Sequence, residues 1–235
     1  MNLFLSVLLV SFGLAYLFVV SLMSFKQRSN VVWIVLLNIG IFVYTYFFAP
    51  ELITKYALSG MKITTGHAYT LVTYMFFHAT PLHLFINTFG LLFFGYNLEK
   101  YMGFPQFLMV YFISGFLAGG FFTLFTPPRI MVVGASGAIF GLMAYFTLIR
   151  PFMITPMPFI IPMPVSLAAV LYVITIIPIM ASGNFSGSVA HVAHLGGMIG
   201  GGLMAFGMNY LQALKGLIIV TFIAVLTYIL PMFLK

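Results

Sequence analysis

Ser136 is the residue of this sequence with the clearest chemical potential. It lies in the stretch Gly-Ala-Ser-Gly at 134–137, at the start of an apolar run. A serine hydroxyl becomes a nucleophile when a histidine takes its proton. A serine in this place can also be a helix N-cap, or a small residue that lets two helices pack closely. Its role therefore depends on the side chains that the fold brings to it.

His194, far along the chain, is the candidate partner of Ser136. Gly197 and Gly201 follow it at +3 and +7, on or near its face of a helix, where they let another helix approach closely. Glycines around the serine allow the same approach: Gly134, Gly137 and Gly141. Close packing of the two segments would bring Ser136 Oγ to hydrogen-bond distance of His194. That is the geometry that a nucleophilic Ser–His pair needs.

His83 and Asn87 form a second polar pair. Their i, i+4 spacing puts both on one face of a helix, and both side chains can donate hydrogen bonds. They could serve a reaction, or they could lock two helices together. The functional interpretation gains weight because Ser136, His194, His83 and Asn87 stand in a chain that has few other polar groups.

The composition identifies the setting as a lipid bilayer. The chain has 235 residues, of which 63% are hydrophobic and only 5% charged, and its mean hydropathy is +1.19. So few charges could not cover a water-soluble domain, which predicts a polytopic membrane protein. The net charge of +7 does not indicate nucleic-acid binding, because the basic residues are scattered singly through loops.

The acidic residues exclude several mechanisms. The sequence has no Asp and no Cys, and its only acids are Glu51 and Glu99, both at the ends of apolar segments. A Ser–His–Asp triad, an aspartyl dyad and thiol chemistry are therefore excluded, and no zinc motif of the H-E-x-x-H type is present. An ion-coupled transporter is disfavoured for want of an intramembrane carboxylate.

Eight apolar segments follow one another along the chain. Backbone groups in lipid must be satisfied internally, so we expect helices. We place them at 3–23, 31–49, 83–98, 105–125, 136–149, 165–181, 190–211 and 216–234. The longest loop covers 50–82. The Pro-rich stretch 150–164 indicates a connector at the membrane interface.

Counting the segments places the polar groups near one face of the membrane. The third, fifth and seventh segments begin on the same face, and their starts hold His83, Ser136 and His194. Only 14 residues separate Ser136 from Arg150, about 21 Å of helix against a hydrocarbon core of about 30 Å. If Arg150 marks one surface, Ser136 lies about 10 Å below the other. The preceding stretch must then be surrounded by protein or line a wet cavity.

Taken together, the motifs resemble the rhomboid family of intramembrane serine proteases. The resemblance lies in H-x-x-x-x-H-x-x-x-N at His78, His83 and Asn87, in G-x-S-G at 134–137, and in H-x-x-G-x-x-x-G from His194. Glu99 in "LEKYMG" also fits. It implies an all-α, six-helix rhomboid-like core at 31–211 around the short serine-bearing helix. An extra helix with a linker would then occupy 1–30 and another extra helix 212–235, eight helices in all.

The resemblance also implies roles. Ser136 would be the nucleophile and His194 its general base, while His83, Asn87 and the Ser136 backbone N–H would form the oxyanion hole. His78 would order the first loop, and Phe140 would stack beside the catalytic histidine. The glycines at 134, 137, 197 and 201 would frame the site. We prefer His194 to His191 as the base because it is followed by glycine at +3 and +7.

No cofactor or metal is implied, and the partners would be transmembrane protein substrates and the lipid bilayer. The Trp-Arg pair of many family members is replaced by Tyr69-Thr70, which leaves the bracing of the first loop open. A rhomboid-like pseudoprotease that binds membrane helices without cutting them is the alternative, although it would be expected to lack the serine or the histidine. A channel or transporter ranks third.

The basic residues suggest an orientation. Four lie at the Ser136 end, Lys55, Lys62, Arg129 and Lys235, against five at the other end, Lys26, Arg28, Lys100, Arg150 and Lys215. The positive-inside rule slightly favours a Ser136 end outside the cytoplasm. We expect a multi-pass protein of the cell membrane whose active site opens toward the extracytoplasmic side.

Overall fold

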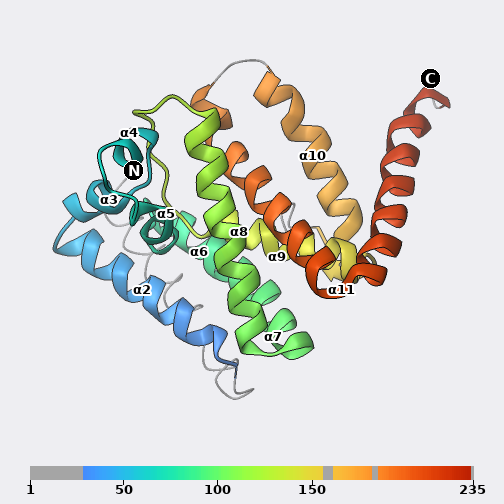
Figure 1. Ribbon diagram of the computed structural model, residues 1–235, viewed down its shortest axis with the longest axis horizontal. Coiled ribbons are helices and arrows are strands. Elements are labelled where there is room, and N and C mark those ends of the chain that lie inside the picture. Colours follow the sequence, from blue (N-terminus) through green and yellow to red (C-terminus); the bar gives the residue numbers. More distant parts are fainter. Residues whose placement is uncertain (1–28, 156–160, 182–184, 234–235) are drawn as a thin grey trace.

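The computed structural model describes residues 29–155, 161–181 and 185–233, and this part of the chain is predominantly helical (Figure 1). The helix expected at 3–23 lies outside the described residues. The elements are α2 (Val31–Phe47), α3 (Glu51–Tyr56), α4 (Gly60–Thr64), α5 (Thr70–Thr73), a 3₁₀ turn η1 (Tyr74–Phe76), α6 (Pro81–Gly90), a π-helical turn η2 (Leu91–Gly95), α7 (Tyr96–Met102), α8 (Phe104–Phe125), α9 (Ser136–Ile149), α10 (Val165–Ala181) and α11 (Phe185–Phe233).

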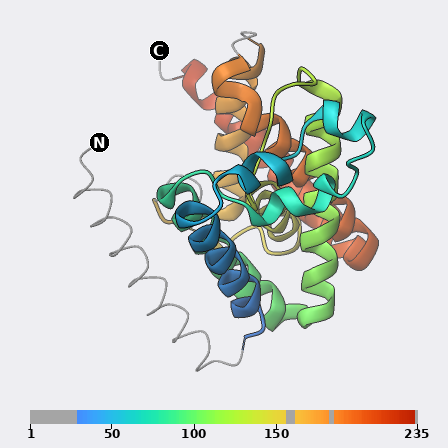
Figure 2. The ribbon, with the colours of Figure 1, turned by 90° about the vertical axis from the view of Figure 1, so that its left-hand side faces the viewer.

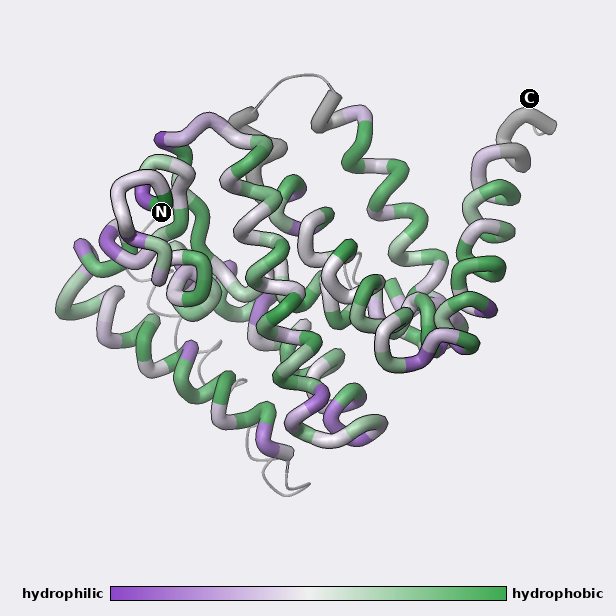
Figure 3. Tube along the Cα trace, viewed as in Figure 1, coloured by the Kyte–Doolittle hydropathy of each residue, from purple (hydrophilic) through white to green (hydrophobic). Residues whose placement is uncertain are grey.

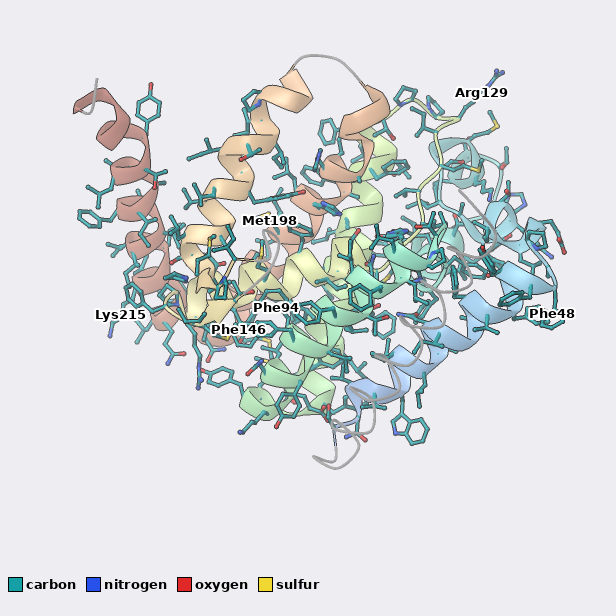
Figure 4. The ribbon with its side chains drawn as sticks, turned by 180° about the vertical axis from the view of Figure 1, so that it is seen from behind. Phe48, Phe94, Arg129, Phe146, Met198 and Lys215 are labelled. Carbon is teal, nitrogen blue, oxygen red and sulfur yellow. The ribbon has the colours of Figure 1, made fainter. Side chains whose placement is uncertain are left out.

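The short helix α9 forms the centre of the molecule. Every residue from Gly137 to Ile149 is buried, and α6, η2, α8, α10 and α11 all pack against it. Figure 4 shows Phe94 of η2 and Phe146 of α9 meeting near the middle of the molecule, with their ring centroids 6.3 Å apart. The sequence of α9 suits a helix that is enclosed on all sides, because it has no charged residue and three glycines or alanines in its first turns.

Glycines bring α11 into backbone contact with its neighbours. A Cβ added at Gly197 would lie 1.9 Å from the carbonyl oxygen of Gly137, and one at Gly201 would lie 1.8 Å from that of Gly141. On the adjacent face of α11, a Cβ at Gly200 would lie 2.8 Å from Ser114 Cα of α8. Two glycine faces therefore let α11 pack against α9 and α8 at once.

Glu99 of α7 holds the start of α2. Its carboxylate accepts hydrogen bonds from Ser29 Oγ at 2.5 Å, from the backbone and side-chain nitrogens of Asn30 at 2.9 Å each, and from the backbone of Val31 at 3.4 Å. These donors include N–H groups of the first helical turn, which have no partner within the helix. A negative charge there also complements the helix dipole. The acid therefore joins α2 to α7.

The first loop is more structured than the sequence indicated. Residues 50–82 contain α3, α4, α5 and η1, which lie over the end of α2 and beside α8 (Figure 2). Tyr69 and Thr70, which stand in place of a Trp-Arg pair, lie at the start of α5. The Lys62 ammonium donates to three carbonyls at and just beyond the end of α3, those of Thr54, Lys55 and Ala57. This lysine therefore braces the loop.

The loop also covers the non-helical chain before α9. Leu58 and Val132 exchange two backbone hydrogen bonds, at 3.0 and 2.9 Å, and the Gly134 N–H donates to the Tyr74 carbonyl at 2.8 Å. These bonds satisfy backbone groups that could find no partner in lipid. The expected protein surroundings of the segment before Ser136 are therefore present.

The described helices suit a bilayer. By length and composition, Phe104–Phe125 and Ala190–Tyr228 could each cross one, and so could the bent pair Thr70–Phe76 with Pro81–Met102. The apolar helices α2, α9 and α10 are shorter. Figure 3 shows hydrophobic residues along the helices and hydrophilic ones gathered mainly in the loops and at helix ends. In Figure 4, Arg129 lies at the top of the molecule and Lys215 at its lower left.

The main differences from the sequence-based expectation lie in three regions. The helix expected at 83–98 runs from Pro81 to Met102 through the π-helical turn, because Thr80 Oγ1 caps it by accepting from the His83 N–H at 3.1 Å. The two helices expected at 190–211 and 216–234 are both present within α11, but they meet at a kink at Asn209 (φ −145°, ψ 55°), two residues before the expected end of the first. The connector 150–164 contains an antiparallel pair of two-residue strands, β1 (Ile154–Thr155) and β2 (Met163–Pro164).

The glycine contact predicts a sharp positional effect. We expect Gly201→Ala to lower the thermal unfolding midpoint in detergent by about 5 °C or more, because its Cβ would overlap the Gly141 carbonyl. Gly207→Ala is the matched control on the same helix, since its Cβ would meet no atom within 4 Å. Equal midpoints for the two variants would contradict the packing argument.

Candidate active site

Ser136 and His194 lie in direct contact. Ser136 is the first residue of α9, and its Oγ is 2.8 Å from His194 Nε2 on α11. Both side chains are partly exposed rather than sealed in the core. The close packing of α9 on α11 at Gly137 and Gly197, one and three residues further along, explains why they meet. The contact that the glycine spacing predicted is present.

Aromatic rings hold the His194 imidazole. The Phe140 ring stacks on it, with centroids 4.1 Å apart and planes at 16°. The Tyr172 ring of α10 also contacts Phe140, with centroids 4.4 Å apart, and its centroid lies 6.0 Å from that of His194. Tyr172 Oη is 2.5 Å from His194 Nδ1, so both ring nitrogens of His194 have hydrogen-bond partners. Phe140 therefore stacks on His194 as expected, and Tyr172 is an additional contact of this histidine.

His83 stands beside the turn that leads to Ser136. A Cβ at Gly134 would lie 2.6 Å from His83 Nε2, and Gly134 has a φ of +120° that residues with side chains rarely adopt. Glycine thus serves both the turn and the space that the histidine ring occupies. The His83 ring can reach the approach to Ser136 because no side chain intervenes at Gly134.

His78 lies behind His83. It is fully buried, and its ring is 5.2 Å from that of His83 in an edge-to-face arrangement. Burial, helped by the neighbouring His83, lowers the pKa of His78 to about 3, so the ring is neutral. An uncharged ring packed in this way helps to fix the position of His83.

Asn87 lies one turn after His83 on α6. Its Nδ2 donates to the His83 carbonyl at 2.8 Å, which uses one of its two N–H donors. The side chain is almost fully buried, and its Oδ1 has no hydrogen-bond partner among the described residues. One amide N–H therefore stays available for another acceptor.

The sequence analysis missed Tyr172 and the contact of His191. Tyr172 Oη is also 2.9 Å from His191 Nδ1, so this hydroxyl bridges the two histidines. The available signal was weak: Tyr172 is one of three hydroxyl-bearing residues in the apolar run 165–181, with Ser166 and Thr175, and the pattern does not reveal which face points inward. Within the described residues, no group of three or more His, Asp or Glu could hold a metal ion.

Comparisons with known proteins agree with the resemblance. The family model for the Rhomboid domain matches residues 65–211. "RHOMBOID-like protein 12, mitochondrial" of Arabidopsis thaliana is 28% identical over 195 residues, 75% of this chain and 57% of that protein. "Rhomboid-like protein 11, chloroplastic" of the same plant is 34% identical over 53% of this chain and 44% of that protein. "Rhomboid-like protease 3" of Toxoplasma gondii is 39% identical over 30% of this chain and 27% of that protein. The chain thus matches less than two thirds of the length of each.

The Ser136–His194 contact predicts selective reactivity. A serine whose proton is taken by a histidine reacts with fluorophosphonates, whereas an ordinary serine does not. We expect the purified protein to be labelled, and Ser136→Ala and His194→Ala each to lose the label. Ser114→Ala, which changes a fully buried serine of α8, is the control and should be labelled normally. Persistent labelling of Ser136→Ala would place the reactive group elsewhere.

Proposed function

The chain belongs to the rhomboid family and is a multi-pass membrane protein, and from this premise we propose that it is an intramembrane serine endopeptidase with a Ser136–His194 dyad. The observation that carries the proposal is the 2.8 Å distance between Ser136 Oγ and His194 Nε2. A hydroxyl used only as a helix cap would not need a histidine, itself stacked on Phe140, in this position.

The proposed reaction begins with proton transfer. His194 Nε2 takes the proton of Ser136 Oγ as the oxygen attacks a peptide carbonyl carbon. The resulting oxyanion would accept hydrogen bonds from the His83 ring, the Asn87 amide and the Ser136 backbone N–H. Each such donor typically stabilises the transition state by about 3–4 kcal/mol. His194 then gives its proton to the leaving amine, and water releases the acyl group by the same path in reverse.

The substrates would be transmembrane segments that unwind. A helix hides its carbonyls in hydrogen bonds to the residue four positions ahead, so the scissile segment must leave helical form first. We propose single-pass membrane proteins with Gly, Ser or Pro near the cut and a small residue before it. The partly exposed Ser136 and the lipid setting support this class.

The alternative is a pseudoprotease that binds membrane helices without cleaving them. Such a protein would not need a serine and a histidine in hydrogen-bond contact, nor a polar pair beside them. The comparisons include both a relative named as a protease and relatives named only as rhomboid-like proteins. Cleavage is therefore the measurement that separates the two functions.

The arrangement in the membrane is part of the proposal. We propose a six-helix core within 31–211, flanked by additional helices in 1–30 and 212–235, with the Ser136 end facing away from the cytoplasm. The charge difference between the two ends, five basic residues against four, supports this orientation. Two relatives are named for mitochondria and chloroplasts, so the cell membrane remains a prediction for this chain.

The nucleophile is tested directly. In proteoliposomes with a single-pass substrate, we expect Ser136→Ala and His194→Ala to abolish cleavage while the fold persists, because either change removes half of the dyad. His191→Ala can change the rate but should not abolish cleavage, because His194 and not His191 contacts Ser136. Substrate cleavage is read by gel, and thermal unfolding checks the fold. Full activity of Ser136→Ala would contradict the proposed protease function.

The oxyanion role of Asn87 has its own test. We expect Asn87→Ala to lower kcat by about 100-fold or more with little change in KM, because the lost donor acts mainly in the transition state. Asn97→Ala is the matched control: its Nδ2 likewise donates to a carbonyl four residues back, that of Phe93, at 2.6 Å. A rise in KM alone would make Asn87 a substrate-binding or packing residue.

A further inference from the structure

A chain of hydrogen bonds continues from the dyad into α10 and back to α11. Tyr172 Oη lies 2.5 Å from His194 Nδ1 and 2.9 Å from His191 Nδ1, while His194 Nε2 lies 2.8 Å from Ser136 Oγ. Tyr172 is only 7% exposed, so water does not readily replace these contacts. Four side chains from three helices therefore share one continuous set of hydrogen bonds.

The chemistry of the dyad fixes the direction of these bonds. To accept the serine proton, His194 Nε2 must be unprotonated, so the neutral ring carries its hydrogen on Nδ1. That N–H must donate, and the only partner within reach among the described residues is Tyr172 Oη. The tyrosine hydrogen is then directed to His191 Nδ1, which accepts it only when unprotonated there. Each donor along the chain has one acceptor.

Without Tyr172, the other tautomer of His194 would be favoured. A buried Nδ1–H with no acceptor is costly, and a ring that moved its hydrogen to Nε2 could no longer act as a base. In a Ser–His–Asp triad a carboxylate prevents this. Here Glu99 is bound at the start of α2 and Glu51 begins α3, so neither acid takes that place.

We propose that Tyr172 is a positioning residue that holds His194 in the tautomer able to act as a base, and that His191 acts through Tyr172 by accepting its hydroxyl hydrogen. The inference rests on the proposed function. During the reaction one proton moves, from Ser136 Oγ to His194 Nε2, while Tyr172 and His191 keep theirs. The imidazolium formed still donates its Nδ1–H to the tyrosine oxygen. Because His191 accepts the Tyr172 hydroxyl hydrogen, a lone pair of the tyrosine oxygen stays directed at His194 Nδ1.

The test compares Tyr172→Phe with the unchanged protein. Phenylalanine keeps the ring against Phe140 and removes only the hydroxyl. We expect a fall of about 10- to 100-fold in kcat and in the fluorophosphonate labelling rate, the effect of losing a hydrogen bond to a charged group. KM should be unchanged, and the protein should still fold, with a thermal midpoint lowered by only a few degrees. Tyr145→Phe is the matched control, since it removes another buried hydroxyl, bonded to Asn209 at 2.6 Å, and should retain activity.

The role of His191 is tested through the same hydroxyl. His191→Leu, which removes the acceptor, should lower kcat by a smaller factor than Tyr172→Phe. His191→Asn offers an oxygen near the position of Nδ1 and should restore kcat to within about twofold of the unchanged protein. In the Tyr172→Phe background, His191→Leu should have no further effect, because its action requires the hydroxyl.

The outcomes separate the inference from the function on which it rests. Wild-type kcat in Tyr172→Phe would overturn the positioning role, and equal losses from His191→Leu in both backgrounds would overturn the coupling. Either result would leave the dyad intact, provided that Ser136→Ala is inactive and the unchanged protein is active. If the unchanged protein neither cleaves nor labels, the proposed function itself fails.

Discussion

The backbone contact between α9 and α11 determines where Ser136 and His194 stand relative to each other. At Gly197 and Gly201 the two helices approach so closely that a single methyl group would overlap the carbonyls of Gly137 and Gly141. Without a hydrophobic driving force between helices in lipid, such close contact is a main source of association. It also sets the axial position of α11 on α9, and with it the distance between Ser136 and His194.

The second requirement is that the backbone of the non-helical segment before α9 finds hydrogen-bond partners within the protein. A helix that begins below the membrane surface needs an irregular segment before it, and its backbone groups must find partners in the protein. The first loop supplies them at Leu58 and Tyr74, while Gly134 makes the turn beside His83. The loop thus does more than connect two helices, since it satisfies the polar backbone from which the site is built.

The sequence predicted α9 to the residue, because glycines precede and follow Ser136 and Arg150-Pro151 ends the apolar run. It also predicted the Ser136–His194 contact, since glycine spacing marks a helix face. A break between the last two helices was predicted at 212–215, but not its position at Asn209, because it accompanies a tertiary hydrogen bond from Asn209 to Tyr145 that no local pattern reveals. The start of α6 could have been found, since Thr80-Pro81 is a recognisable N-cap and first-turn pair.

The scarcity of acids explains the kind of site that remains. A carboxylate among membrane helices is costly unless it is well paired, and here Glu99 accepts four hydrogen bonds at the start of α2. A histidine base still needs its ring fixed and its second nitrogen bonded. Neutral groups do this at lower desolvation cost: Phe140 fixes the plane of the ring, and the Tyr172 hydroxyl meets its Nδ1. A neutral partner orients the base but stabilises its positive charge less than a carboxylate would. In the proposed reaction, more of the transition-state stabilisation would therefore come from the donors proposed to face the oxyanion.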